Sequence, residues 1–394
     1  MTYYLCSPTN TKRMDRPSPF FPGARPSGSN FLNRTEELAR LQTNFKSGIH
    51  TILVSPRRWG KSTLVDEASQ RVQADNKKIK FCFIDLYKIK SEREFLTMLA
   101  QEAIKASSTK LETAVKEVRG LFKHIIPHIN ISPDDTQTLS LGFEWKQAEK
   151  HKAELFDLPE RLAASKGFKF VICIDEFQKI RDFETPGVKG SFVQELRAYW
   201  QLHKNTSYCL YGSKRHMMMA MFNNHENPFY RFGDMVQLKK VDVSYWSVFI
   251  QKQFKATGKS ISKELSIHIA EKMENVSFYV QHLAHTAWTK TKSKCTNEII
   301  EASVDEMLSF QSGNFQQDLE SLTANQLNFL RAVLSGVTSF TSQLVVNKFD
   351  LGSPSSVSTV RKSLESSEII DVMDGVITIQ DPLFQLWLKR TISI

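Results

Sequence analysis

Residues 55–62, SPRRWGKS, place a lysine before a hydroxyl residue, as phosphate-binding loops do. The P-loop pattern is a glycine, four residues, and then Gly-Lys-Ser or Gly-Lys-Thr. Gly60, Lys61 and Ser62 match this pattern, whereas Ser55 stands where the first glycine would be. In such loops the lysine bridges the β- and γ-phosphates and the hydroxyl is a ligand of Mg²⁺. The loop therefore predicts a site for ATP and Mg²⁺.

The other residues of this loop are larger than those that phosphate-binding loops usually contain. Ser55 and Pro56 can still make the tight turn that points backbone N–H groups at a phosphate. Arg57 and Arg58 can add charge near the phosphates, or can be solvated or paired with carboxylates. Trp59 is expected to pack under the loop and stiffen it. Nucleotide binding is assigned to Ser55, Pro56, Arg57, Arg58, Trp59, Gly60, Lys61, Ser62 and Thr63.

Two carboxylates follow a second apolar run, KFVICIDE (169–176). Asp175 is placed to hold the water shell of Mg²⁺, and Glu176 to orient or deprotonate the attacking water. Carboxylates at a strand end are often only solvated. Their combination with a P-loop on another strand favours the catalytic interpretation, so the two motifs together predict a slow, Mg²⁺-dependent ATPase.

Polar residues after a third apolar run complete the candidate site. In YCLYGSKR (208–215), Ser213 is placed to sense the γ-phosphate, and an ordinary strand-end serine is the alternative. Arg231, in NPFYRFGD, is a candidate arginine finger, which stabilises charge on the γ-phosphate in the transition state. It could act within its own subunit or from a neighbouring one. Arg197 is the second candidate, and a salt bridge at a helix end is the alternative for both.

These residues need a scaffold, and the apolar runs that precede them are short and separated by helical stretches. Runs without alternation suit strands buried on both faces, which indicates a parallel sheet between helices. A helix over 33–48, ended by Gly48, should precede the first strand. The weakly patterned stretch 103–150 is predicted to be a helical insertion in a core of residues 31–237. The predicted strands are 51–54, 79–86, 169–174 and 207–211.

Patterning divides the rest of the chain into three parts. Residues 1–30, rich in proline and polar residues, should form an extended basic arm and no core element. Residues 238–315 are helical only and form a predicted lid. Residues 316–394 follow the order helix, helix, helix, hairpin, which is that of a winged-helix domain. Its third helix should start at Ser353-Pro354, and its hairpin should turn at Asp374-Gly375.

Charge and composition limit the partners of the protein. The net charge of +10 indicates an acidic partner, which may be nucleotide, nucleic acid or protein. The excess lies in 239–295, with ten lysines and four carboxylates, whereas 318–394 has six basic and eight acidic residues. No apolar run approaches the roughly 18 residues of a membrane helix. The N-terminus lacks the apolar segment of a secretion signal, so we expect a cytoplasmic protein.

Eight segments together resemble the archaeal-type P-loop ATPases, a family that is also widespread in bacteria and is related to AAA+ and STAND ATPases. The resemblance covers the chain from about residue 19 to its end. The segments are NFLNRTEEL, SPRRWGKSTLV, LFDLPERLA, IDEFQKI, YGSKRHMM, PFYRFGD, FYVQHLA and DPLFQLWL.

The resemblance implies an α/β fold with a parallel sheet of the ASCE type, in which the strand with the catalytic glutamate lies between the P-loop and sensor strands. An all-α lid and a C-terminal winged helix should follow. It also implies that Asn33 and Arg34 lie near the adenine and ribose. Relatives usually carry a proline before the aromatic pair of the lid helix, where this chain has Ser277.

Two functions fit these observations. The favoured one is an ATP-binding and ATP-hydrolysing switch, in which the nucleotide closes the lid and winged helix against the core. The alternative is a DNA-associated ATPase that uses the winged helix or the basic lid. The exposed face of the third helix offers mainly serines, which favours the switch. In the switch, the apolar patch 381–388 should pack on the ATPase core. A protein partner and self-association stay open.

Overall fold

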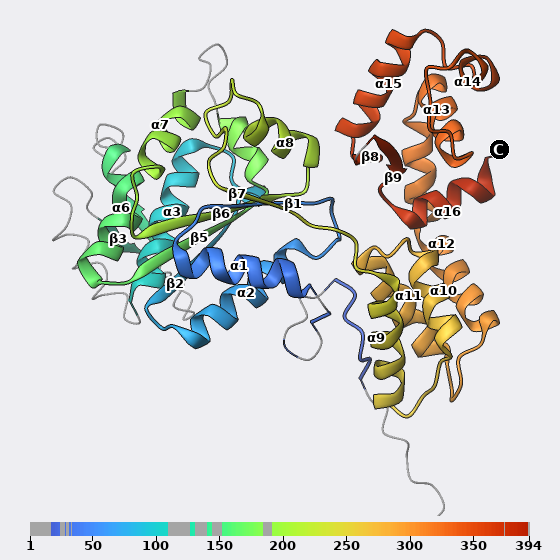
Figure 1. Ribbon diagram of the computed structural model, residues 1–394, viewed down its shortest axis with the longest axis horizontal. Coiled ribbons are helices and arrows are strands. Elements are labelled where there is room, and N and C mark those ends of the chain that lie inside the picture. Colours follow the sequence, from blue (N-terminus) through green and yellow to red (C-terminus); the bar gives the residue numbers. More distant parts are fainter. Residues whose placement is uncertain are drawn as a thin grey trace, which may run out of the picture.

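The computed structural model shows a sheet domain, a bundle of helices and a smaller C-terminal domain, in that order along the chain (Figure 1). Asn33 lies outside the described residues, so its predicted role near the adenine stays a prediction. For the two short strands between 127 and 143 the backbone alone is described. The structure describes residues 17–23, 28, 31–32, 34–108, 127–130, 140–143, 152–183, 191–373 and 375–392.

A parallel five-stranded sheet, in the order β2-β5-β6-β1-β7, forms the centre of the first domain. Four of its strands were predicted to within one residue. The fifth, β7, was missed because it is a short edge strand in which Val236 alone is fully buried. The strands are β1 (Thr51–Val54), β2 (Ile79–Asp85), β5 (Lys169–Asp175), β6 (Thr206–Gly212) and β7 (Asp234–Gln237).

The order of the strands differs from the expected one. We expected the strand that ends at Asp175 to lie between the P-loop strand and the strand that leads to Ser213. Instead β6, the strand that leads to Ser213, lies between β1 and β5. Because the carboxyl ends of parallel strands meet at one edge, this order puts Ser213 between the P-loop and the two acidic residues.

Helices cover both faces of the sheet (Figure 1). Alternate residues of each strand point to opposite faces, so Leu53 packs with α1 and α2, whereas Ile52 and Val54 pack with α3, α6, α7 and α8. Gly48 ends α1 with a φ of 74°, as predicted. The helices are α1 (Thr35–Ser47), α2 (Lys61–Asp75), α3 (Glu92–Ser107), α6 (Lys152–Lys166), α7 (Ser191–Trp200) and α8 (Arg215–Asn223), with 3-10 turns η2 (Leu86–Lys88) and η4 (Phe177–Phe183).

The region between β2 and β5 is not simply helical. Where it is described, the predicted helical insertion at 103–150 contains the end of α3 and an antiparallel hairpin of β3 (Pro127–Asn130) and β4 (Ser140–Phe143). The weak patterning of this polar stretch gave no strand signal, so the hairpin could not be predicted.

The helical region and the C-terminal domain follow the predicted order. The third helix of the winged-helix domain starts with Pro354, and the side chain of Ser353 caps it by accepting from the N–H of Ser356. None of the described helices is long and apolar enough to cross a membrane. The elements are α9 (Val243–Ala256), α10 (Lys263–Lys272), α11 (Ser277–Lys290), α12 (Asn297–Glu320), α13 (Ala324–Leu334), α14 (Gln343–Phe349), α15 (Pro354–Ser366), β8 (Ile370–Met373), β9 (Val376–Ile379) and α16 (Pro382–Thr391).

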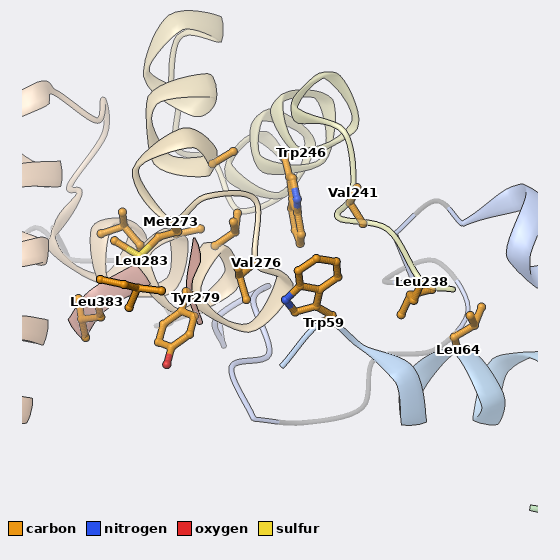
Figure 2. Close-up of a cluster of buried hydrophobic side chains, with 14 of the residues drawn as sticks. Trp59, Leu64, Leu238, Val241, Trp246, Met273, Val276, Tyr279, Leu283 and Leu383 are labelled. Atoms are coloured by element: carbon orange, nitrogen blue, oxygen red, sulfur yellow. The ribbon is translucent and has the colours of Figure 1, made fainter. Parts of the chain in front are cut away.

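One buried apolar cluster runs from the α1–α2 face of the sheet through the lid into the winged helix. Figure 2 shows Trp59 of the P-loop beside Trp246 and Val241, and Leu383 of α16 beside Tyr279. Trp59 was expected to pack under its own loop, but its indole reaches the lid. The P-loop is therefore coupled to the lid by apolar packing.

The N-terminal arm contributes to this cluster. Phe20 is 3% exposed and packs edge-on against the rings of Phe249 and Phe254 of α9, with centroids 6.2 and 5.8 Å away. The prediction that residues 1–30 form no part of the core is therefore wrong at Phe20. A single aromatic side chain among prolines has no periodicity that would mark it as buried.

The apolar patch at 381–388 does not pack on the ATPase core, so that prediction is wrong. Phe384 and Trp387 lie against Phe315 of α12, with ring centroids 5.3 and 5.8 Å away. Leu383 belongs to the same cluster as Tyr279 of the lid (Figure 2). The spacing of these residues on the helix was recognised correctly, but spacing does not say which apolar surface a helix will meet.

Candidate nucleotide site

The loop between β1 and α2 folds round the side chain of Lys61. This side chain is buried, and its Nζ atom donates hydrogen bonds to the carbonyl oxygens of Ser55 (2.9 Å) and Pro56 (3.0 Å). Gly60 precedes α2 with a φ of 93°, a conformation that glycine adopts at little cost. Ser55 is not among the residues with positive φ. The loop thus turns round Lys61 without a residue of positive φ at position 55.

Electrostatics also suit this loop to an anion. Burial lowers the pKa of the Lys61 ammonium to about 8, against the opposing influence of nearby carboxylates, Glu176 foremost. A cation that burial disfavours regains its charge beside a phosphate. The N-terminus of α2 adds the positive end of its dipole at the same place.

The hydroxyl and the carboxylate predicted for Mg²⁺ lie together. Ser62 Oγ donates to Asp175 Oδ2 at 2.8 Å, and the N–H of Glu176 donates to Asp175 Oδ1 at 2.9 Å. Burial raises the pKa of the Asp175 carboxyl, an effect that a bound cation would oppose. Mg²⁺ is usually held by one or two carboxylates together with substrate phosphates and water. The oxygen atoms of Ser62 and Asp175 fit that requirement.

Glu176 is held in a particular orientation. Its Oε2 atom accepts from Ser213 Oγ at 2.9 Å and from Gln178 Nε2, and its backbone has a φ of 53°. Non-glycine residues seldom adopt this left-handed conformation, and it recurs at active sites. Gly212 allows the arrangement, because a Cβ atom there would lie 1.9 Å from Gln178 Oε1. The carboxylate is therefore turned toward Ser213.

Both loop arginines are paired, and their partners come from the winged-helix domain. Arg57 Nε donates to Ser213 Oγ at 3.2 Å, and its Nη2 atom lies 3.3 Å from Glu368 Oε2. Arg58 Nη1 donates to Asp381 Oδ2 at 2.9 Å. Of the alternatives for these arginines, pairing with carboxylates is the one observed. The winged helix thus reaches the phosphate end of the site.

A cavity of about 390 Å³ lies beside the loop. One end is polar and contains Lys61, Asp175 and Glu176. The other end is mainly apolar and is formed by the arm and the lid, with the size and character of a pocket for a nucleoside. Its lining there includes Phe21, Gly23, Phe31, Leu32, Val241, Trp246, Ser277, Phe278 and Gln281.

Arg34 lines this cavity but is engaged with the protein backbone. It is 7% exposed, and its guanidinium donates to the carbonyl oxygens of Trp59 (2.6 Å) and Lys239 (2.8 Å). Burial lowers its pKa to about 10. Ser277 Oγ donates to the Trp59 carbonyl as well, at 3.3 Å. Arg34 therefore fixes the loop to the lid, and Ser277, which replaces the proline of relatives, adds a bond that proline could not make.

Neither candidate arginine finger lies near the phosphate end of its own site. Arg231 precedes β7, whose first residue pairs with the first residue of β1, so Arg231 lies at the amino edge of the sheet. Arg197 packs over Phe232 at the same edge, 4.8 Å from the ring centroid. Neither lines the cavity. Arg231 therefore lies at the edge of the sheet opposite the P-loop of its own subunit, because the chain runs from one edge to the other between β6 and β7.

The parallel sheet, the P-loop and the domains that follow define the fold of a P-loop ATPase with a helical lid and a winged helix, in which β6 lies between the P-loop strand and the strand that ends at Asp175. A family described as "Probable winged helix domain" matches residues 313–390. No curated protein matches the sequence.

Two solved structures share this fold over nearly the whole chain. A Walker-type ATPase of Pyrococcus abyssi, PABY2304, is 17% identical with a TM-score of 0.64, and the match covers 96% of this chain and 99% of that one. The ORC2 protein of Aeropyrum pernix, in complexes with ADPNP and ADP, is 12% identical with a TM-score of 0.55, covering 91% and 95%. At this identity the likeness establishes the fold alone.

Sequence reasoning missed three polar residues of the site. Gln178 holds Glu176, while Glu368 and Asp381 hold the loop arginines. Gln178 and Asp381 lie in segments that carry the family resemblance, IDEFQKI and DPLFQLWL, so their positions gave a signal. Glu368 lies in a polar turn, SSE, that gave none.

Proposed function

We propose that this protein binds ATP with Mg²⁺ and hydrolyses it slowly, and that the nucleotide controls how the lid and winged helix pack on the core. The observation that carries the proposal is that one edge of the sheet gathers a buried lysine, a hydroxyl-carboxylate pair, a second carboxylate and a sensor serine. These residues are Lys61, Ser62, Asp175, Glu176 and Ser213. Acidic residues of a separate domain reach the same edge, as an AAA+ or STAND-like switch would need.

Each residue has a task in hydrolysis. Lys61 holds oxygen atoms of the β- and γ-phosphates, and Ser213 donates a hydrogen bond to the γ-phosphate. Ser62 and Asp175 would hold Mg²⁺, which would supply positive charge to neutralise the phosphates. Glu176 orients the attacking water and accepts its proton. To do so its carboxylate must leave Ser213 and Gln178, which is our reason to expect slow turnover.

The replacement Glu176→Gln tests this proposal. The amide keeps the size of the side chain but cannot accept the proton, so turnover should fall by about 10²–10⁴-fold, the usual contribution of a general base. ATP binding should be preserved. Its measurement by calorimetry is also the control that the variant is folded. Unchanged turnover would assign the base to another residue.

We propose that Arg231, if it is an arginine finger, acts on the nucleotide site of a second copy of the chain and not on its own. It is exposed, and its φ of 52° is unusual for a residue other than glycine. Mixing two inactive variants tests this. In a mixture, Lys61→Ala protein would supply Arg231 to the intact site of Arg231→Ala protein and restore hydrolysis. No recovery at any ratio would make Arg231 a structural residue.

A DNA-associated ATPase is the second candidate, and one observation favours it. The face of α15 with Ser358, Arg361 and Lys362 is exposed and does not take part in the contact with the core. The domain has more acidic than basic residues, however, so it offers few phosphate contacts. We expect full-length protein to bind duplex DNA weakly, and tight binding that falls steeply with salt would favour this candidate.

A further inference from the structure

An acidic side chain from the winged-helix domain lies beside the γ-phosphate sensor. Glu368 follows α15 and is held with a φ of 60°, and its side chain is mostly buried. Its Oε2 atom lies 3.3 Å from Arg57 Nη2, and Ser213 Oγ lies 3.5 Å from its Oε1 atom. The carboxylate is therefore within reach of a cation and a hydroxyl that belong to the nucleotide site.

Arg57 and Ser213 connect this carboxylate to the catalytic residues. Arg57 also donates to Ser213 Oγ, and Ser213 donates to Glu176. One anion from the winged helix thus interacts with several groups that would otherwise stabilise the terminal phosphate.

The other two charged contacts of this interface differ from that of Glu368. Asp381 pairs with Arg58 and receives a hydrogen bond from Tyr279 of the lid, while Asp371 lies 3.6 Å from Arg215. Neither carboxylate is hydrogen-bonded to Ser213 or Glu176 among the described contacts. These pairs can persist when the groups round Ser213 change partners. Glu368 is the acidic residue placed to respond to a third phosphate.

We propose that Glu368 and the γ-phosphate of ATP compete for Arg57 and Ser213, so that the docked winged helix favours ADP over ATP. The inference rests on the proposed function and adds a residue that determines nucleotide preference. Two anions cannot both be fully paired with one guanidinium and one hydroxyl, and they repel each other at short range. ADP lacks the third phosphate and leaves the contacts of Glu368 in place.

A ligand shifts a conformational equilibrium only by its different affinity for the two states. Here that difference arises at the third phosphate, because its charge is opposed by Glu368 when the domain is docked. ATP should therefore release the surface of the winged helix that contains Glu368 and β8 from the core, and ADP should not. By reciprocity, removal of the Glu368 charge should strengthen ATP binding relative to ADP binding.

The test compares the affinities of ADP and a non-hydrolysed ATP analogue for wild-type protein and for Glu368→Gln. We expect the variant to shift the affinity ratio toward the ATP analogue by about tenfold, within the usual range of couplings between sites. Glu365→Gln is the matched control, since Glu365 lies three residues earlier and has no ion pair among the described contacts. Its ratio should equal that of the wild type.

A second variant shows whether Arg57 carries the competition. In protein with Arg57→Gln, the two anions no longer share a cation but still repel each other and still share Ser213. A further Glu368→Gln change should therefore shift the ratio by a different factor than it does when Arg57 is present, and equal shifts would show that Arg57 takes no part in the competition. An unchanged ratio in the single Glu368→Gln variant, with both nucleotides bound, would overturn this inference and leave the proposed function intact. Failure of wild-type protein to bind either nucleotide would instead overturn the proposed function.

Discussion

The winged-helix domain contacts the rest of the molecule through two surfaces of different chemistry. Its lid-facing surface is mainly apolar, with Leu383 and Phe384 only 2% and 4% exposed, and it carries one exposed ion pair, between Arg390 and Asp305. Its core-facing surface is charged and consists mainly of carboxylates that meet arginines at Arg57, Arg58 and Arg215. Figure 1 shows the domain joined to the lid by the long helix α12. The difference indicates that the winged helix stays attached to the lid, whereas its contact with the core can separate.

Apolar and ionic contacts respond differently to change. Burial of an apolar side chain contributes about 1.5–3 kcal/mol and does not depend on ionic strength in the way that charge pairs do. An exposed ion pair contributes about 0–1 kcal/mol and is screened by salt. We infer that the lid and the winged helix move as one body, while the charged surface separates from the core.

The largest effect should follow damage to the apolar surface. Phe384→Ala removes a buried ring that contacts Phe315 and Trp387. The free energy of unfolding should fall by about 3–5 kcal/mol, as large-to-small changes in cores do. Urea unfolding of the full chain measures it. Leu344→Ala is the control, since Leu344 is 85% exposed, and it should change little.

A loss below about 1 kcal/mol in the free energy of unfolding of Phe384→Ala would show that this surface is loosely packed.

The double change of Phe384 and Trp387 to serine should unfold the winged helix and not merely alter turnover, because both rings pack within the domain and on α12.

The second-largest effect should follow the loss of the most buried ion pair on the charged, core-facing surface. Arg215 and Asp371 have side chains that are 13% and 9% exposed, and Arg215 also donates to the carbonyl oxygen of Val372. Removal of one partner of a buried pair costs about 3 kcal/mol or more. Arg215→Met should therefore undock the winged helix, which hydrogen exchange in β8 would reveal. Asp371→Asn in the same protein should recover part of the loss.

If Arg215→Met left exchange in β8 unchanged, the charged surface would not be what holds the docked state. The pKa of the Asp371 carboxyl is raised by its burial, so an unpaired Asp371 would tend to take up a proton instead of staying charged. Repeating the measurement at higher pH favours the charged carboxylate, so a loss of docking that grows with pH would show that protonation of Asp371 masks the effect.

Salt should have a smaller effect, and mainly on the charged surface. The side chains of Arg57 and Arg58 are 51% and 48% exposed, so their pairs are accessible to ions. A rise in ionic strength from about 0.05 to 0.5 M shortens the screening length severalfold and should speed exchange in β8 a few-fold. Exchange in α12 and α16 should change less, because apolar packing holds these helices together in addition to their one exposed ion pair. Equal acceleration of both regions would contradict the comparison.

The sequence predicted those parts of the molecule that depend on local pattern. The four core strands, the start of α15 at Ser353-Pro354 and the P-loop follow from apolar runs and from turn chemistry within a few residues. The charged surface could not be predicted, because Arg58 and Asp381 are 323 positions apart. The position of Arg231 could not be predicted for a related reason. Its closeness along the chain to β6 does not show at which edge of the sheet the segment after α8 ends.

The smallest effect should appear in the pH dependence of ATP binding. The pKa of Lys61 is lowered to about 8 in the free protein, chiefly by burial, and bound phosphates would raise it again. The bound state then holds a proton that the free state has lost. ATP affinity should be full below about pH 8 and should decline as the pH rises above that value.

Calorimetry of ATP binding at about pH 9, in two buffers with different ionisation enthalpies, measures this proton directly. We expect uptake close to one proton, because the terminal phosphate, with a pKa of about 6, is already ionised. Lys61→Arg should show no uptake, since its guanidinium stays charged. Glu368→Gln removes one carboxylate that opposes the lowered pKa of Lys61, so the decline should begin at slightly lower pH. Wild-type binding without proton uptake would mean that Lys61 is already charged, and that water reaches the P-loop beneath the docked domain.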